Sequence, residues 1–170
     1  CPKHFAVNNQ ETRRMASDSV VDERTLREIY LTGFEIAVKE GKPRSIMSAY
    51  NLINGEYANE NKHLLMDVLR DEWKFGGAVI TDWGGSNDHA LGVKYGSTLE
   101  MPAPGGDSVR ELIAAVKNGK IEEADVNARL SELLPLIFDT KAALESAPKS
   151  FDAEVHHALA RRAAAESLVL

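Results

Sequence analysis

The chain has little of several features that define common classes of protein. Of its 170 residues only Cys1 is a cysteine, which excludes an internal disulfide framework and any zinc site built on cysteines. No apolar run reaches the roughly 18 residues that a membrane span needs. Basic residues are not in surplus, because 20 Lys and Arg stand against 26 Asp and Glu, for a net charge of −6. We therefore expect no membrane partner. We also expect no nucleic-acid partner, because the sequence offers no basic stripe that could bind phosphates.

Motifs for metals, phosphates and activated serines are lacking as well. No group of His, Asp and Glu has the spacing of metal ligands, so neither a metal nor an organic cofactor is predicted. Gly84-Gly85 alone does not make a phosphate-binding loop, and Ser86 lacks the glycine–serine–glycine frame of a nucleophile elbow. The histidines at positions 63, 89, 156 and 157 are expected at the surface or on helices. A hydrophobic content of 44% is nevertheless ordinary for a globular chain.

What the chain does contain is an alternation of strand-like and helix-like segments. Strands are predicted at 2–7, 45–50, 77–82 and 97–101, and loops at 8–21 and 51–59, the latter with a turn at Asn54-Gly55. Helices are predicted at 22–41, from the end of the loop at Asn59 to about Trp73, at 87–94, at 107–118, around 126–137 and at about 152–164. A linker is predicted at 141–150. Their apolar stripes are interpreted as core faces, and they include Leu26, Ile29, Tyr30, Leu65, Val68, Leu69, Val109, Leu112, Ile113, Val116, Val126, Leu130, Leu133, Leu134 and Ile137.

This alternation predicts an α/β fold with a parallel sheet and right-handed crossovers. Four strands are half of those in a (β/α)8 TIM-type barrel, which needs roughly 200–250 residues. We therefore expect residues 1–140 to form a partial barrel, its C-terminal half. The chain starts without Met and stops within the apolar run that follows Glu166, so we also expect an internal piece of a longer polypeptide.

Polar residues stand at the C-terminal ends of three of these strands. They are Lys3-His4, Tyr50-Asn51 and Asp82-Trp83, and in a parallel barrel such ends converge on one face. A carboxylate can attack an anomeric carbon, Lys and His bind hydroxyls, and an indole stacks on a sugar ring, so this group suits a carbohydrate. Each residue also has a plainer interpretation: a helix N-cap for Asp82, solvated surface for Lys3-His4, and packing for Tyr50 and Trp83.

Four ordered motifs resemble glycoside hydrolase family 3, in its β-glucosidase and β-xylosidase branch. They are Lys3-His4-Phe5 followed by Asn8-Asn9-Gln10-Glu11, then Met47-Ser48-Ala49-Tyr50-Asn51, then Val79-Ile80-Thr81-Asp82-Trp83-Gly84, and finally Leu99-Glu100-Met101-Pro102. The segment from Ala160 to Leu170 is also similar to that family, in which it begins a second domain, an α/β sandwich. Residues 141–170 are accordingly expected to be a linker and the start of that second domain, the rest of which is not in the chain.

The resemblance implies a retaining β-glycosidase that removes terminal non-reducing β-D-glucosyl residues through a covalent intermediate. Asp82 would be the nucleophile, and the substrate-binding residues would be Lys3, His4, Met47, Tyr50 and Trp83. The expected ligand is a β-glucoside or a short β-gluco-oligosaccharide. In this family an Asp and an Arg that clamp the sugar would precede Cys1, and the acid/base Glu would follow Leu170.

Two other interpretations of the chain remain open. It could be a β-xylosidase, or it could be a non-catalytic half-barrel that binds sugar or merely assembles. The exposed edges of a half-barrel sheet have unpaired backbone groups that tend to pair with another strand. The expected protein partners are therefore the missing parts of the same polypeptide or a second copy of the chain. Among the carboxylates Glu11, Glu56, Glu60 and Glu100, spacing marks none as the acid.

Overall fold

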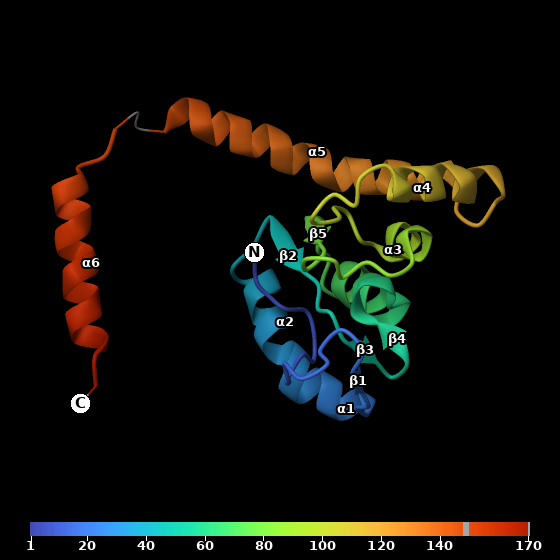
Figure 1. The fold of residues 1–170 in the computed structure, drawn as a ribbon, viewed down its shortest axis with the longest axis horizontal. Helices are drawn as coiled ribbons and strands as arrows, with labels where there is room; N and C mark the ends of the chain where they lie inside the picture. Colours follow the sequence, from blue (N-terminus) through green and yellow to red (C-terminus); the bar gives the residue numbers. More distant parts are fainter. Residues whose placement is uncertain (148–149, 170) are drawn as a thin grey trace. The chain divides into compact units, whose positions relative to one another are not determined.

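A computed structural model describes residues 1–147 and 150–169, and the chain divides into two units, Cys1–Phe138 and Asp139–Leu170. The strands are β1 Asp18–Ser19, β2 Ser45–Met47, β3 Leu52–Ile53, β4 Glu56–Tyr57 and β5 Ala78–Ile80. The helices are α1 Glu23–Thr25, η1 Leu26–Leu31, α2 Thr32–Lys39, η2 Ala58–Glu60, η3 His63–Glu72, α3 His89–Tyr95, α4 Asp107–Lys117, α5 Glu123–Ser146 and α6 Ala153–Ser167 (Figure 1).

Four extended segments of the first unit run parallel to one another. Strands β2 and β5 pair in parallel with Ile46 opposite Val79, while Phe5 forms a parallel bridge to Ser48 and Ile80 forms one to Leu99. The neighbours therefore follow the chain order, as an α/β fold with helical crossovers requires. The predictions of full strands at 2–7 and 97–101 are wrong, because each segment contributes one bridge to its single neighbour among the described residues rather than a ladder.

A second, small sheet lies outside this parallel set. Strand β1 pairs in parallel with β3, and β3 pairs antiparallel with β4. The predicted turn at Asn54-Gly55 is confirmed, since both residues have positive φ, +51° and +91°, as a tight hairpin turn requires. The prediction that 8–21 and 51–59 are loops without strands is wrong, because they hold β1, β3 and β4.

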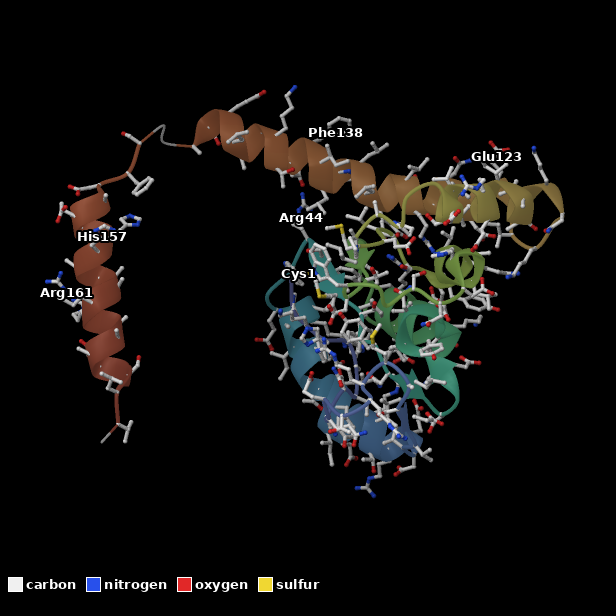
Figure 2. All side chains as sticks on the ribbon, in the orientation of Figure 1. Cys1, Arg44, Glu123, Phe138, His157 and Arg161 are labelled. Carbon is white, nitrogen blue, oxygen red and sulfur yellow. The ribbon has the colours of Figure 1, made fainter. Side chains whose placement is uncertain are left out.

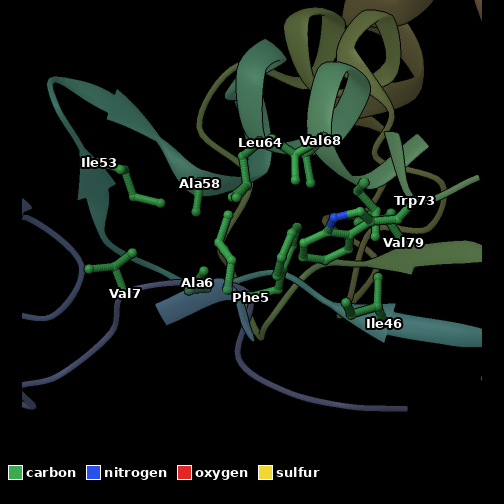
Figure 3. Packing of buried hydrophobic residues seen from close by; sticks show 14 of the residues in the cluster. Phe5, Ala6, Val7, Ile46, Ile53, Ala58, Leu64, Val68, Trp73 and Val79 are labelled. Atoms are coloured by element: carbon green, nitrogen blue, oxygen red, sulfur yellow. The ribbon is translucent and has the colours of Figure 1, made fainter. Parts of the chain in front are cut away.

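The main core is built around Phe5. Its ring meets those of Phe34 and Trp73 with centroids 5.0 and 5.9 Å apart, and it is fully buried together with Ile46 and Val79 from the paired strands (Figure 3). Helix η3 contributes the buried side chains of Leu64, Leu65, Val68 and Leu69, which confirms the predicted core face of that helix. This core holds the Phe5 segment, β2 and β5 in place, and the predicted polar site residues lie on these segments or at their ends.

The helix after Asp22 buries a different face from the predicted one. Leu26 is buried as expected, but Ile29 is 69% exposed and Leu31 is fully buried instead. The cause is local winding: η1 is a π-helix, and its wider turn shifts which residues share a face relative to a regular α-helix. The 3.6-residue period used to choose the core face therefore fails over this stretch.

The apolar stripes of the later helices are only partly buried. Leu112, Val116 and Val126 pack against a second cluster formed by Ala90, Ala115 and Ile121. The core assignment is wrong for the residues that are about half exposed, namely Val109, Ile113, Leu130, Leu134 and Ile137. A helical stripe identifies an apolar face, but it does not say which element covers that face.

A single long helix occupies most of the predicted linker. Residues 141–146 belong to α5, so the expected linker is helical over this part, and positions 148–149 lie outside the described residues. Ala and Lys are strong helix formers, and Lys141 lies 3.8 Å from Glu145 one turn later. Helix α6 confirms the last predicted helix, and its N-cap is Asp152, whose carboxylate accepts the backbone N–H groups of Glu154 and Val155. None of the described helices is long and apolar enough to cross a membrane.

Candidate active site

A tight turn at the end of β5 carries Asp82. The Gly85 N–H donates to the Asp82 carbonyl over 2.9 Å, and Gly84 between them has φ +76°, a conformation that favours glycine. The Trp83 N–H donates to Asp82 Oδ1 over 2.7 Å and so orients the carboxylate. The plain sequence Asp-Trp-Gly-Gly thus encodes a turn that presents a mostly buried carboxylate, with 11% of its side chain exposed.

The turn is also tied to the neighbouring segment. The Gly84 N–H donates to the Met101 carbonyl over 2.9 Å. The Thr81 hydroxyl accepts from the Met101 N–H at 2.8 Å and lies 3.1 Å from the Met101 carbonyl. Because Asp82 sits between two such anchored residues, its backbone position is held from both sides. It is not a helix N-cap, since the next helix, α3, is capped by the Asp88 side chain.

An imidazole and a phenol from two other segments meet the Asp82 carboxylate. His4 Nε2 lies 3.3 Å from Asp82 Oδ2. Burial first, and then hydrogen bonding and charge from Asp82, raise the pKa of the Tyr50 hydroxyl, so the phenol stays protonated at neutral pH. The structure therefore brings together His4, Tyr50 and Asp82, as the strand-end argument predicts.

The remaining predicted site residues lie on the same segments but are more open. Lys3 is exposed, and among the described residues its ammonium group makes no hydrogen bond or ion pair. Met47 is half-buried at the end of β2, and Trp83 is 60% exposed. These three side chains are accessible to a ligand, whereas the carboxylate beside them is largely enclosed.

Arg14 is a candidate that the sequence reasoning missed. Its guanidinium lies 4.6 Å from the centroid of the Tyr50 ring, within cation–π range, and its Nη1 donates to Glu11 Oε2 over 2.7 Å. The sequence predicts only a polar loop over 8–21, the segment that contains Arg14. The only signal in the sequence was the cluster of charges from Glu11 to Arg14, which does not by itself indicate where the loop folds.

Of the four carboxylates that spacing left open, Glu11, Glu60 and Glu100 have partners. Glu11 pairs with Arg14 as above, and Glu100 lies 3.2 Å from His89 Nδ1. Burial raises the pKa of Glu60, whose Oε1 accepts the backbone N–H groups of Asn87 and Asp88 and so anchors the loop after the turn. Glu56 is exposed on the hairpin strand β4.

His89 is more buried than the sequence suggested. Only 16% of its side chain is exposed, and besides Glu100 it faces Glu111, with Nε2 3.6 Å from that carboxylate. The prediction of a surface or helix position is confirmed for the helix, because His89 opens α3. Across residues 1–147 and 150–169, no group of three or more His, Cys, Asp or Glu residues is arranged to hold a metal ion.

These features define an α/β protein in which polar side chains gather at the carboxyl ends of parallel strands. The chain belongs to glycosyl hydrolase family 3, since the model of that family's N-terminal domain matches residues 1–136. That domain is a TIM-barrel-like α/β fold, which agrees with the parallel neighbours seen here.

Known proteins resemble the chain over nearly all of its length. Thermostable beta-glucosidase B of Acetivibrio thermocellus is 49% identical over 172 residues, which cover 100% of this chain and 22% of that protein. The exo-alpha-(1->6)-L-arabinopyranosidase of Bifidobacterium longum is 42% identical over 168 residues, 99% of this chain and 22% of that protein. The chain thus spans about a fifth of the length of these relatives.

Solved structures share the fold as well. The crystal structure of the beta-glucosidase of Kluyveromyces marxianus in complex with glucose matches with a TM-score of 0.79 and 42% identity. The match covers 84% of this chain and 17% of that one.

Proposed function

We propose that the chain is the C-terminal half of the (β/α)8 barrel in a retaining β-glucosidase, with Asp82 as the nucleophile. In this proposal residues 1–140 supply part of the catalytic domain, and residues 141–170 lead into a second α/β sandwich domain. The observation that supports it most directly is the oriented Asp82 carboxylate, which lies 3.3 Å from His4 and accepts the Trp83 N–H. The names of the relatives, one of them a beta-glucosidase at 49% identity, point the same way.

The geometry suits nucleophilic attack by a carboxylate. Asp82 would attack the anomeric carbon as the bond from that carbon to the glycosidic oxygen breaks and the acid/base protonates that oxygen, giving a glycosyl-aspartate ester and the free leaving group. Water, deprotonated by the same acid/base, would then attack the anomeric carbon and free the Asp82 carboxylate, so that the sugar leaves with its original configuration. The protonated Tyr50 hydroxyl and the Trp83 N–H would hold the carboxylate in position, and no metal or organic cofactor is needed for these steps.

The substrate would be held by the more open residues of the same face. Lys3 and His4 would donate to sugar hydroxyls, Met47 would line the pocket, and the exposed Trp83 ring would offer a stacking surface. A retaining mechanism needs a second carboxyl group roughly 5–5.5 Å from the first. We propose that this acid/base, like the Asp and Arg that clamp the sugar, comes from other parts of the longer polypeptide.

A mechanism-based label tests the assignment of Asp82. The full-length polypeptide that contains this chain would be inactivated with an activated 2-deoxy-2-fluoro-β-glucoside, digested and analysed by mass spectrometry. We expect the label on Asp82, and we expect Asp82→Asn to lower turnover at least about a thousandfold. The matched control is Asp88→Asn, because Asn still caps α3. A label on another carboxylate, or near-normal turnover by Asp82→Asn, would refute the assignment.

The arabinopyranosidase relative provides a specific reason to test a second substrate. The full-length polypeptide would be assayed on aryl β-glucoside, aryl β-xyloside and aryl α-L-arabinopyranoside under the same conditions. We expect the largest kcat/KM on the β-glucoside. A larger value on one of the pentosides would reassign the substrate while leaving the role of Asp82 intact. Sugar binding without turnover of any of the three would favour a non-catalytic module.

A further inference from the structure

A cavity of about 480 Å³ lies at the opposite end of β2 and β5 from Asp82. Its walls include Pro43, Trp73 and Phe75, and it reaches Arg44 and Gly77, which immediately precede the two strands. Figure 2 labels Arg44 at this end of the sheet. Asp82 comes five positions after Gly77, or about 16 Å along an extended chain, so a ligand here would not touch the candidate active site. We call this space the basal cavity.

Cationic side chains outnumber acidic ones around the basal cavity. Lys39, Lys42, Arg44 and Lys74 line it, although Lys39 pairs with Glu35 and Arg44 also has an interaction partner. The one acidic residue in the lining is Glu132, and both of its oxygens are engaged by arginines, at 2.8 Å from Arg70 and 2.6 Å from Arg129. The positive charge of the rim is therefore not neutralised by that carboxylate.

Two of these cations have no partner within the described part of the chain. Lys39 pairs with Glu35, but the ammonium groups of Lys42 and Lys74 make no hydrogen bond or ion pair among the described residues. Both lysines stand just after the C-terminal end of a helix, α2 and η3, with φ of +46° and +58°, the left-handed conformation in which helices commonly end.

The combination of walls and rim defines the chemistry of the ligand. The volume falls in the range of small-molecule sites, about 300–1,000 Å³. Aromatic and aliphatic walls favour an apolar body, and ammonium groups at the rim favour an anion. We propose that the basal cavity binds a small aromatic carboxylate, with its ring along the wall formed by Pro43, Trp73 and Phe75 and its carboxylate toward Lys42 and Lys74. This second site does not depend on the proposed glycosidase function.

Titration of the 170-residue chain with benzoate tests the proposal. Isothermal calorimetry gives the affinity. Trp73 fluorescence in a Trp83→Phe background reports the location, because the chain has only these two tryptophans. Benzyl alcohol serves as the neutral isostere, and inorganic phosphate serves as the anion without an apolar body. We expect saturable benzoate binding that changes Trp73 emission and weakens as salt is added, with much weaker binding of the other two compounds.

A double lysine variant and its control test which residues bind the carboxylate of benzoate. Lys42→Gln/Lys74→Gln should bind benzoate at least about tenfold more weakly, since two charge-assisted contacts are lost. The matched control, Lys94→Gln/Lys117→Gln, removes two exposed lysines on α3 and α4 and should keep the parent affinity. If the double variant fails to fold by circular dichroism, the two single variants provide the same comparison. No saturable benzoate binding, equal binding of benzyl alcohol or of phosphate, or equal loss in the control would overturn the proposal.

Discussion

Replacing Glu132 by alanine should destabilise the chain more than most single substitutions. Glu132 is 13% exposed and lies between Arg70 and Arg129, whose side chains are each 9% exposed. It also accepts the Thr98 hydroxyl over 2.7 Å. Burial lowers the pKa of Arg70 to about 10, so this guanidinium is still charged at neutral pH.

The expected magnitude follows from what the substitution leaves behind. Without Glu132, two buried cations face each other with no counter-ion, although each keeps one or more backbone carbonyls, such as Gly96 for Arg70 and Val93 for Arg129. Removing one partner of a buried ion pair costs about 3–5 kcal/mol. That is a large part of the 5–15 kcal/mol by which domains are typically stable. The corresponding fall in Tm is about 10–15 °C for a unit of this size.

Urea titration of the 170-residue chain, followed by Trp73 fluorescence and circular dichroism, measures the loss. The matched control is Glu145→Ala, also on α5, because Glu145 is 68% exposed and its pairing with Lys141 is long, at 3.8 Å. The control should change the free energy of unfolding by less than about 0.5 kcal/mol. A loss under about 1 kcal/mol for Glu132→Ala would show that the arginines are compensated by their carbonyls, and the reasoning would be wrong.

Three further predictions concern the site and the loops that hold it. Gly84→Ala should cost about 1 kcal/mol because of its φ of +76°, whereas Gly76→Ala, with no positive φ and no neighbour within 4 Å, should be near neutral in the same melts. Tyr50→Phe should lower kcat/KM of the full-length polypeptide about a hundredfold, because Asp82 loses a donor; an unchanged kcat/KM on an aryl β-glucoside would contradict this. Burial raises the pKa of Glu60 above 4.5, so the folded state binds more protons above that pH and its stability falls as pH rises through the raised pKa. Urea titrations should therefore show Glu60→Gln gaining stability relative to the parent over that range, and a difference independent of pH would refute it.

The candidate site was largely predictable because its residues stand next to recognisable strand ends. Asp82 follows an apolar run and precedes two glycines, and the ordered motifs place His4 and Tyr50 on neighbouring segments. Arg14 was not predictable, because it reaches Tyr50 through a loop whose path depends on contacts far along the sequence. The burial of His89 likewise depends on Glu100 and Glu111, which come from two other segments.

Local sequence was enough to define the α/β alternation, the hairpin turn at Asn54-Gly55 and the position of Asp82 at a strand end. These follow from local properties: apolar runs, glycine's freedom at positive φ, and capping. The buried face of each helix could not be read from local sequence, as the exposed side chains of Ile29 and Ile113 show, because burial depends on the neighbouring element and on local winding as well as on the apolar stripe. Parallel pairing of segments about 30 to 80 residues apart also turned the predicted shared face into particular contacts, with His4 and Tyr50 at the Asp82 carboxylate.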